Sequence, residues 1–363
     1  MKTDKGMQNL IEQFSQTVLG AGRDRRPLRI LGSGSKSFYG RDTQGDALDV
    51  TGYSGIVSYE PTELVLTARA GTPLTEIEAV LAAKRQMLAF EPPHFGTGAT
   101  LGGCIAAGLS GPCRAYTGAV RDYVLGVRMI DGKGDVLNFG GQVMKNVAGY
   151  DVSRLLAGSL GTLGLLLEVS LKVLPLPVEE LSLRFDMTER EAIDAMNRWA
   201  AQPLSLSATC YHDGVLSVRL SGAAAAVRSV RTKLGGEVVA DAEVFWRSVR
   251  EQQHVFFQTD ASEKARALWR LSLPSAAPMP DVPGRQLIEW GGALRWLVSD
   301  TPAAHIRQAA TARGGQAILF RSTAPDADPF HPLSPSLLRL HQRLKQSFDP
   351  HGIFNPGRMY REF

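Results

Sequence analysis

The glycines of this 363-residue chain are unevenly distributed: 26 of the 37 lie in residues 1–177 and 11 in residues 178–363. A glycine inside regular structure costs roughly 0.5–1 kcal/mol relative to alanine. Such a cost is offset where bare backbone must approach another object, such as a flat ligand or a pyrophosphate. The first half of the chain is therefore expected to bring its backbone close to a ligand.

The first glycine segment, Gly32-Ser-Gly-Ser-Lys-Ser37, follows a short apolar strand, Leu28–Leu31. This is the right place for backbone N–H groups to cradle a phosphate. A dinucleotide fingerprint G-x-G-x-x-G would need glycine at Ser37, and a P-loop would need glycine at Ser35. A nicotinamide-type Rossmann fold and a P-loop NTPase are both disfavoured, and a surface turn is the alternative for this segment taken alone.

Two further segments continue the theme. Residues 96–118 hold seven glycines in 23 positions, which predicts an irregular loop rather than any regular element. The run Gly158-Ser-Leu-Gly-Thr-Leu-Gly164 opens an apolar stretch that we expect to be a buried strand. Three glycine segments that meet on one extended ligand explain the pattern more economically than three unrelated loops.

Composition limits the class of protein. Hydrophobic residues make up 44% and charged residues 21% of a 39.3 kDa chain, so it can bury cores for two domains, or for one domain with a large insertion. The net charge of +4, without basic blocks, disfavours a nucleic-acid partner and would suit an anionic substrate. Cys104, Cys113 and Cys210 form no C-x-x-C pair, which argues against a disulfide framework and a zinc site and fits a reducing compartment.

No segment is apolar enough to suggest a membrane span. The longest charge-free apolar stretch, Leu155–Leu167, has 13 residues, whereas a spanning helix needs roughly 20. The N-terminus has no apolar region of the secretory type. We expect a cytosolic chain that reaches a membrane only through partners.

Periodicity predicts the elements that surround these loops. The first twenty residues read as an amphipathic helix, residues 47–70 as two strands, and Pro73 as the start of a helix. From residue 178, strands and helices alternate with few glycines, which is typical of an α+β domain with an antiparallel sheet. An amphipathic helix over Pro335–Phe348 follows near the C-terminus.

Four segments together resemble the FAD-binding domain of the vanillyl-alcohol oxidase type, also called PCMH-type. They are Gly32-Ser-Gly-Ser, Ala99-Thr-Leu-Gly-Gly, Asn146-Val-Ala-Gly-Tyr-Asp151 and Gly158-Ser-Leu-Gly-Thr-Leu-Gly164. The run Phe348-Asp-Pro-His-Gly-Ile-Phe-Asn-Pro-Gly357 is similar to that family's closing motif, which returns to the flavin. The resemblance covers about 1–177 and the C-terminal run closely, and the middle only in layout.

Within the family, three stretches are most similar to the smaller FAD-binding subunit of glycolate dehydrogenase (glycolate oxidase). They are Glu91-Pro-Pro-His94, Val120-Arg-Asp-Tyr-Val-Leu-Gly126 and Val143-Met-Lys-Asn-Val-Ala-Gly-Tyr-Asp151. The resemblance implies an α+β fold in three parts. These are a PCMH-type FAD domain over 1–177, an α/β cap domain with an antiparallel sheet over 178–330, and a segment, 331–363, that returns to the FAD domain.

The resemblance also implies which residues hold FAD. By motif match, the first loop takes the pyrophosphate, the next group lines the flavin and its diphosphate, and the last group meets the adenosine side and the ring. In that order these residues are Gly32, Ser33, Gly34, Ser35 and Lys36; Pro93, Thr100, Gly102, Gly103, Gly111, Tyr116 and Gly118; and Gly161, Gly164, Leu166 and Asn355. Many relatives attach FAD covalently through a first-loop histidine, which this loop lacks, so we expect non-covalent FAD.

Two departures from the family pattern stand out. Leu160 stands where a glutamate often precedes Gly-Thr-Leu-Gly, which puts one hydrogen-bonding contact in doubt. Arg358 replaces a lysine that often follows Asn-Pro-Gly, and it keeps the charge.

Oxidation of a 2-hydroxy acid by a flavin needs a cation for the carboxylate, a base for the hydroxyl proton and access to the flavin. The larger subunit and D-lactate dehydrogenase relatives resemble each other in using a histidine-rich metal site in the cap. The histidines of this chain are scattered, so no metal site is expected. The catalytic base stays unassigned. His94 is a candidate for a catalytic role, and Arg114 and Arg295 are candidates for binding the carboxylate, each with a structural role as the alternative.

The resemblance implies a hetero-oligomer that oxidises glycolate to glyoxylate and passes electrons to quinone. Its partners would be a larger FAD-binding catalytic subunit and an iron–sulfur subunit, at the inner membrane only as a peripheral complex. Three separated cysteines cannot supply the four thiolates of a cluster in this chain. Two alternatives stay open: a flavin-carrying structural or electron-relay subunit without turnover, and a stand-alone FAD-dependent oxidoreductase acting on another hydroxylated substrate.

Overall fold

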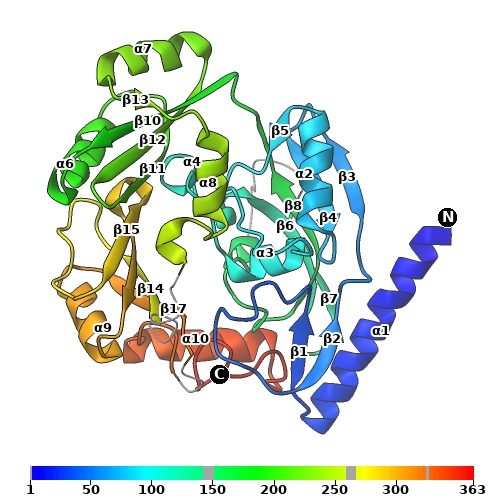
Figure 1. Ribbon diagram of the computed structural model, residues 1–363. Helices are drawn as coiled ribbons and strands as arrows, with labels where there is room; N and C mark the ends of the chain where they lie inside the picture. Colours follow the sequence, from blue (N-terminus) through cyan, green and yellow to red (C-terminus); the bar gives the residue numbers. More distant parts are fainter. Residues whose placement is uncertain (1, 142–150, 259–266, 324–326) are drawn as a thin grey trace.

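The computed structural model describes residues 2–141, 151–258, 267–323 and 327–363. Residues 146–150, the greater part of the motif that ends at Asp151, lie outside the described residues. Figure 1 shows two lobes, each built around its own large sheet. Helix α8 (Ala242–Arg250) lies between the lobes, and α10 (Pro335–Phe348) runs below them in this view.

The first lobe is built on a five-stranded antiparallel sheet in the order β3-β4-β8-β6-β7. Its strands are β3 (Ile56–Glu60), β4 (Val65–Arg69), β6 (Val124–Ile130), β7 (Val136–Gly140) and β8 (Leu165–Lys172). Side chains that alternate along β8 are buried on both faces of the sheet. On one face they pack with helices α2 (Leu74–Ala83) and α3 (Leu101–Ala107), and on the other with α1 (Lys2–Asp24).

Two short strand pairs complete this lobe. Strands β1 (Leu28–Leu31) and β2 (Asp46–Asp49) are parallel, so the first glycine segment lies in the connection between them. Strands β5 (Gln86–Met87) and β9 (Leu174–Pro175) are antiparallel. The stretch 47–70, expected as two strands, therefore contributes to three: β2, β3 and β4.

The second lobe is an eight-stranded antiparallel sheet in the order β13-β10-β12-β11-β15-β16-β14-β17. Its strands are β10 (Glu179–Asp186), β11 (Leu206–His212), β12 (Val215–Gly222), β13 (Glu237–Val238), β14 (Ala267–Ser272), β15 (Arg285–Glu289), β16 (Leu294–Ser299) and β17 (Gln316–Arg321). Helices α6 (Glu189–Ala200), α7 (Ala224–Leu234) and α9 (Ala303–Thr311) pack on one face. The other face packs against Tyr39, Leu109 and Leu160 of the first lobe, so a continuous hydrophobic cluster joins the two lobes.

The C-terminal segment returns to the first strand of the chain. After α10, the Ile353 carbonyl accepts a hydrogen bond from Leu28 N at 2.7 Å, and Asn355 N donates to the Leu28 carbonyl at 2.9 Å. Phe354 is fully buried there beside Leu28. These contacts hold the C-terminal segment against the first strand, although the entire second lobe separates the two in the sequence.

The prediction of an irregular loop over 96–118 is wrong. The segment contains α3 and the short helix α4 (Arg114–Thr117). Thr100 caps α3 by accepting from Gly103 N, and Gly108 ends it in the left-handed conformation. Position 102, inside α3, requires glycine because a Cβ there would lie 2.8 Å from the Ala70 Cβ. Glycine here serves close helix–strand packing, not irregular backbone.

Candidate functional site

A cavity of about 440 Å³ opens beside β1, at the first glycine segment. It is enclosed by that segment, by α3 and by the C-terminal return. Its lining includes eight of the residues expected to hold FAD: Gly32, Ser33, Gly34, Ser35, Lys36, Thr100, Gly103 and Asn355. Residues from four distant parts of the chain therefore meet at one extended hollow.

The backbone of the first segment leaves donors available beside this cavity. Within the described residues, the N–H groups of Ser33, Gly34 and Lys36 donate no hydrogen bond. Gly34 has φ +76° and open space around the position of a Cβ. Successive unpaired N–H groups in such a turn form an anion-binding concavity. The Lys36 ammonium adds a positive charge nearby, although burial lowers its pKa.

A smaller cavity of about 80 Å³ continues from the first along β8. Its lining contains Gly102, Gly161, Gly164 and Leu166, with Gly32, Gly103 and Asn355 shared between the two cavities. The amide of Asn355 bridges the walls: its Oδ1 accepts from Ile30 N at 2.9 Å, and its Nδ2 donates to the Leu160 carbonyl at 2.7 Å. The C-terminal motif thus joins the first and third glycine segments.

Leu160 and Arg358, the two departures from the family pattern, both line the large cavity. The Arg358 guanidinium donates to the carbonyls of Arg41, Ser37 and Tyr39 at 2.6–2.8 Å. It holds the connection after the first glycine segment in place, and burial lowers its pKa.

A third cavity, of about 30 Å³, lies between the loops of the first lobe and the inner face of the second sheet. Pro93 and Gly111 line it from the first lobe. From the second lobe come Gln252, Arg270 and Glu289, within a wall of aromatic side chains that includes Trp290, Trp296 and Phe320. This cavity was not predicted from the sequence.

Glu289 and Arg270 give the third cavity an unusual electrostatic character. Glu289 is 4% exposed, and burial raises its pKa to about 7, although a hydrogen bond from Trp296 Nε1 at 2.7 Å and the Arg270 charge act against the rise. Arg270 lies over the Trp290 ring at 5.1 Å. No hydrogen bond or ion pair of Arg270 occurs among the described residues, and burial lowers its pKa.

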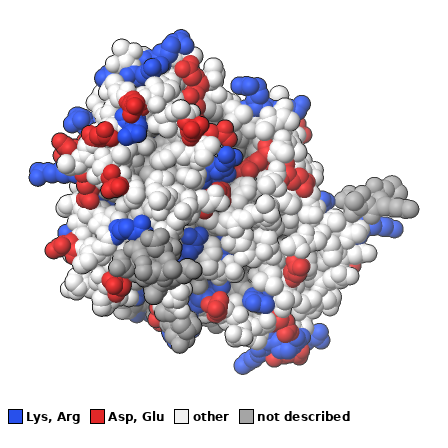
Figure 2. Space-filling model, viewed as in Figure 1, with Lys and Arg blue, Asp and Glu red and all other residues white. Residues whose placement is uncertain are grey.

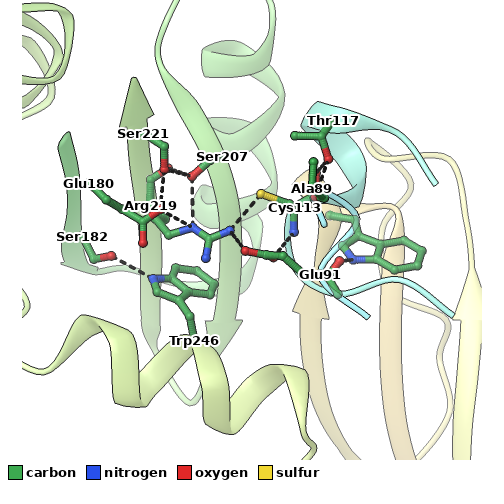
Figure 3. A network of polar contacts seen from close by, with 12 residues as sticks. Ala89, Glu91, Cys113, Thr117, Glu180, Ser182, Ser207, Arg219, Ser221 and Trp246 are labelled. Atoms are coloured by element: carbon green, nitrogen blue, oxygen red, sulfur yellow. Dashed lines mark hydrogen bonds and ion pairs between the residues drawn. The ribbon is translucent and has the colours of Figure 1, made fainter. Parts of the chain in front are cut away.

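A polar network fixes the first-lobe loops against the second sheet (Figure 3). Arg219 of β12 is 5% exposed and donates to Glu91 Oε1 at 2.7 Å, to Cys113 Sγ at 2.9 Å and to Ser207 Oγ at 3.0 Å. Glu91 also accepts from Cys113 N at 2.9 Å. The guanidinium lies over the Trp246 ring of α8 at 5.3 Å. The loops that carry Pro93 and Gly111 are thereby tied to the second lobe.

The candidate catalytic residues do not line the third cavity. His94 Nε2 lies 3.0 Å from Glu78 Oε1, and its backbone N donates to Glu251 Oε2 at 3.0 Å, so it fixes the loop. Arg114 stacks over Trp290 at 4.4 Å. Arg295 is fully buried and donates to the carbonyls of Ser275 and Ala277.

Tyr116 and Gly118 line none of the three cavities. Tyr116 packs against the hydrophobic cluster of α6 and β11, and Gly118 ends α4 at φ +105°. The thiols of Cys104 and Cys113 are buried, which raises the pKa of each to about 12. Both are therefore neutral at pH 7 and lack the thiolate of a reactive cysteine.

Sequence reasoning missed Gln252, Arg270 and Glu289. The available signal was a charge inside an otherwise apolar strand: Arg270 in Ala-Leu-Trp-Arg-Leu and Glu289 after Gln-Leu-Ile. Buried charges are rare unless they are paired or functional. The sequence alone did not show that Arg270 lies in such a strand, because β14 was not predicted.

The described part of the chain shows neither a metal-ligand cluster nor, on the face in view in Figure 2, a patch of one charge. Figure 2 shows positive and negative side chains interspersed over the face in view. Among the described residues, no group of three or more His, Cys, Asp or Glu side chains is arranged to hold a metal ion. None of the described helices combines the length and the apolar character that crossing a membrane requires.

Comparison with known proteins defines the class. Residues 10–140 match the FAD binding domain family, and residues 332–359 match the C-terminal domain of FAD linked oxidases. The fold is similar to that of alkyldihydroxyacetonephosphate synthase, with a TM-score of 0.64 and 15% identity over 95% of this chain and 74% of that one. The chain is therefore an FAD-linked oxidoreductase with a PCMH-type fold, and the predicted fold class and cofactor are confirmed.

The family within this class follows from closer relatives. The chain is 53% identical to glycolate oxidase subunit GlcE of Escherichia coli (strain K12), over 98% of this chain and 97% of that protein. It is 31% identical to glycolate oxidase subunit GlcD of Bacillus subtilis (strain 168), over 53% of this chain and 40% of that protein. The chain belongs to the GlcE family, which confirms the resemblance drawn from the glycine motifs.

Proposed function

We propose that this chain is the FAD-binding GlcE-type subunit of a glycolate oxidase. The observation that carries the proposal is the meeting of the three glycine segments and Asn355 at one continuous hollow, in a chain that matches a GlcE protein over nearly its full length. The hollow fits a dinucleotide, because bare backbone and unpaired N–H groups line it where a diphosphate needs donors.

The residues divide the work of holding FAD. Ser33, Gly34 and Lys36 would bind the diphosphate through backbone N–H groups and one ammonium. Gly102 holds the first turn of α3 close to Ala70, and Gly103 in the same turn would let the cofactor approach the backbone. We keep Pro93, Gly111, Tyr116 and Gly118 as proposed contacts of the flavin side. No first-loop histidine is available, so the attachment is non-covalent.

When bound, FAD supplies a two-electron acceptor. Oxidation of glycolate to glyoxylate releases two electrons and two protons. The chain contributes a buried aromatic environment at the junction of its lobes, and Glu289 is a carboxyl whose pKa allows it to hold a proton near neutral pH. In this assignment His94, Arg114 and Arg295 position loops and aromatic rings.

The chain would act in a hetero-oligomer with a larger FAD-binding catalytic subunit and an iron–sulfur subunit, which would pass electrons to quinone. Its three cysteines are buried and separate in the fold, so a cluster would have to be supplied by a partner. Contact with the inner membrane would then be made through partners. The electron-relay alternative differs only in whether this chain oxidises glycolate itself.

Anaerobic titration of the purified chain with glycolate, followed by flavin absorbance, tests the proposal. We expect one acid-releasable FAD per chain, and glycolate-dependent dye reduction that requires the co-purified larger flavoprotein and iron–sulfur protein. Partial bleaching of the isolated flavin would favour a catalytic role for this chain, and no bleaching would favour the relay. Full turnover by the isolated chain at the rate of the complex would contradict the partnership.

A further inference from the structure

The third cavity has the chemistry of a ligand site that the cofactor hollow does not use. Glu289 of β15 and Arg270 of β14 reach it from strands on either side of β16. Trp296 of β16 is the register partner of Arg270, and its Nε1 donates to Glu289 Oε1 at 2.7 Å. Their charges lie on the inner face of the sheet, directed to the first lobe. Glu289 is buried and Arg270 is partly buried against the Trp290 ring, and charges in such an enclosure are costly unless they find partners.

A third polar group in this cavity lacks a partner. Gln252 follows α8, is 9% exposed and has φ +54°. Its side-chain Oε1 is buried, and no hydrogen bond to it occurs among the described residues. An unmet buried acceptor costs about 1–3 kcal/mol. Arg270 makes no hydrogen bond in the described part of the chain either, so two groups with opposite needs face one small space.

We propose that this cavity binds a small 2-hydroxy carboxylate, with the carboxylate at the Arg270 guanidinium and the hydroxyl at the Gln252 and Glu289 side chains. A guanidinium matches a carboxylate bidentately. A hydroxyl donates one hydrogen bond, which the Gln252 oxygen can accept once its side chain turns into the cavity, because this oxygen is closed to solvent in the structure. The choice of ligand rests on the proposed function, whereas the site itself rests on these three side chains.

The size of the cavity restricts the ligand. The cavity volume is about 30 Å³, and one water molecule needs about 10–15 Å³ of such volume. Only a molecule of a few heavy atoms therefore fits. Trp290, Trp296 and Phe320 form rigid walls. Pro93 and Gly111 place the cavity at the loops expected to line the flavin, which is where an oxidisable hydroxyl would be useful.

Binding of an anion should be coupled to a proton on Glu289. The groups that face this carboxyl are Trp296 Nε1, Arg270, Glu91 and the neutral thiol of Cys210. An ionised Glu289 would repel the incoming carboxylate, and a protonated one would not. Affinity should therefore fall as pH rises through about 7, by up to tenfold per pH unit.

Calorimetric titration of the FAD-loaded full chain with glycolate, acetate and mandelate at pH 6 and pH 8 tests the site. We expect saturable glycolate binding that is tighter at pH 6, weaker acetate binding, and no mandelate binding because the phenyl ring is too large. Arg270→Gln should weaken glycolate binding by about 10- to 100-fold. The matched control is Arg114→Gln, which stacks on the same Trp290 ring but lies outside the cavity lining, and it should change the affinity less than about threefold.

Two further variants keep the test decisive if Arg270→Gln does not fold. Glu289→Gln should remove the pH dependence of glycolate binding, and Gln252→Leu should remove the preference for glycolate over acetate. Absence of saturable glycolate binding in a chain that holds FAD would overturn this inference and leave the cofactor proposal intact. If the chain purifies without FAD, the cofactor proposal fails, and the same titration of the apo chain decides the anion site.

Discussion

Gly34 and Gly214 share a backbone conformation in different surroundings. Gly34 has φ +76° and Gly214 has φ +79°, and a Cβ at either position would meet nothing within 4 Å. Gly34 lines the large cavity, whereas Gly214 lies in the hairpin between β11 and β12. A substitution at both positions therefore imposes similar backbone strain but changes only one cavity.

Gly34→Glu should empty the cofactor site while Gly214→Glu leaves it filled. The new carboxylate would face the diphosphate, and juxtaposed like charges cost several kcal/mol, so FAD affinity should fall by at least about 100-fold. The ratio of flavin to protein absorbance after gel filtration measures occupancy. Equal loss in both variants would mean that strain, not charge at the cavity, decides FAD binding.

Glu289 should make stability depend on pH. Its pKa rises from 4.5 to about 7 on folding, so between these values the folded chain holds a proton that the unfolded chain has lost. The contribution of Glu289 to the free energy of unfolding is fully present below pH 4.5. It is lost as pH rises to 7, by about 3 kcal/mol in total. Urea unfolding of the wild type and Glu289→Gln at several pH values isolates the effect as a difference. Parallel curves for the two proteins would show that Glu289 does not retain its proton on folding.

At the scale of elements, α3 shows why a glycine-rich segment can be a helix. Gly102 faces Ala70 of the chain after β4, and a Cβ would also lie 3.1 Å from the Ala70 carbonyl oxygen. The helix thus packs directly on backbone at the inner end of the cofactor hollow. Thr100 and Gly108 supply the start and stop signals that the glycine count concealed.

Gly102→Ala should therefore destabilise the chain by about 1–3 kcal/mol, as overpacking of a tight contact does. Alanine ordinarily stabilises a helix by up to about 1 kcal/mol relative to glycine. Gly20→Ala in α1, where a Cβ meets nothing within 4 Å, should show that ordinary gain. Thermal unfolding of both variants gives the comparison, and a gain in both would show that α3 has room to move away from Ala70.

The sequence predicted elements well where packing follows a simple period. The amphipathic pattern of the first twenty residues predicted α1, and the apolar run that follows the third glycine segment predicted the buried strand β8, because α1 buries one face and β8 buries both. Helix α8 and strand β14 were missed, although α8 buries Trp246 and Val249 on one face and β14 pairs with both β16 and β17 inside the sheet. The third cavity could not be predicted, because it depends on how the two lobes meet.

At the scale of the whole molecule, one buried ion pair closes the chain. Lys345 of α10 is 5% exposed, and its Nζ lies 2.7 Å from Asp349 Oδ2 and from the carbonyl oxygens of Thr162 and Phe354. Asp349 in turn accepts from the N–H groups of Ile353 and Phe354. A single ammonium therefore links the last helix, the third glycine segment and the C-terminal return that carries Asn355.

Lys345→Met should loosen this closure and the cofactor hollow together. Removing one partner of a buried ion pair leaves an uncompensated charge on Asp349 and typically costs about 3–5 kcal/mol. Arg343→Met, on the exposed side of the same helix, should stay within about 0.5 kcal/mol of the wild type.

Because Asn355 hydrogen-bonds to both Ile30 and Leu160 in the cavity wall, the Lys345 variant should also lose FAD faster during dilution. Chemical denaturation gives the stability change, and the recovery of flavin fluorescence on release gives the dissociation rate. A Lys345→Met chain that is less stable but releases FAD at the wild-type rate would separate the closure of the fold from retention of the cofactor, and would sink the role assigned to the C-terminal motif.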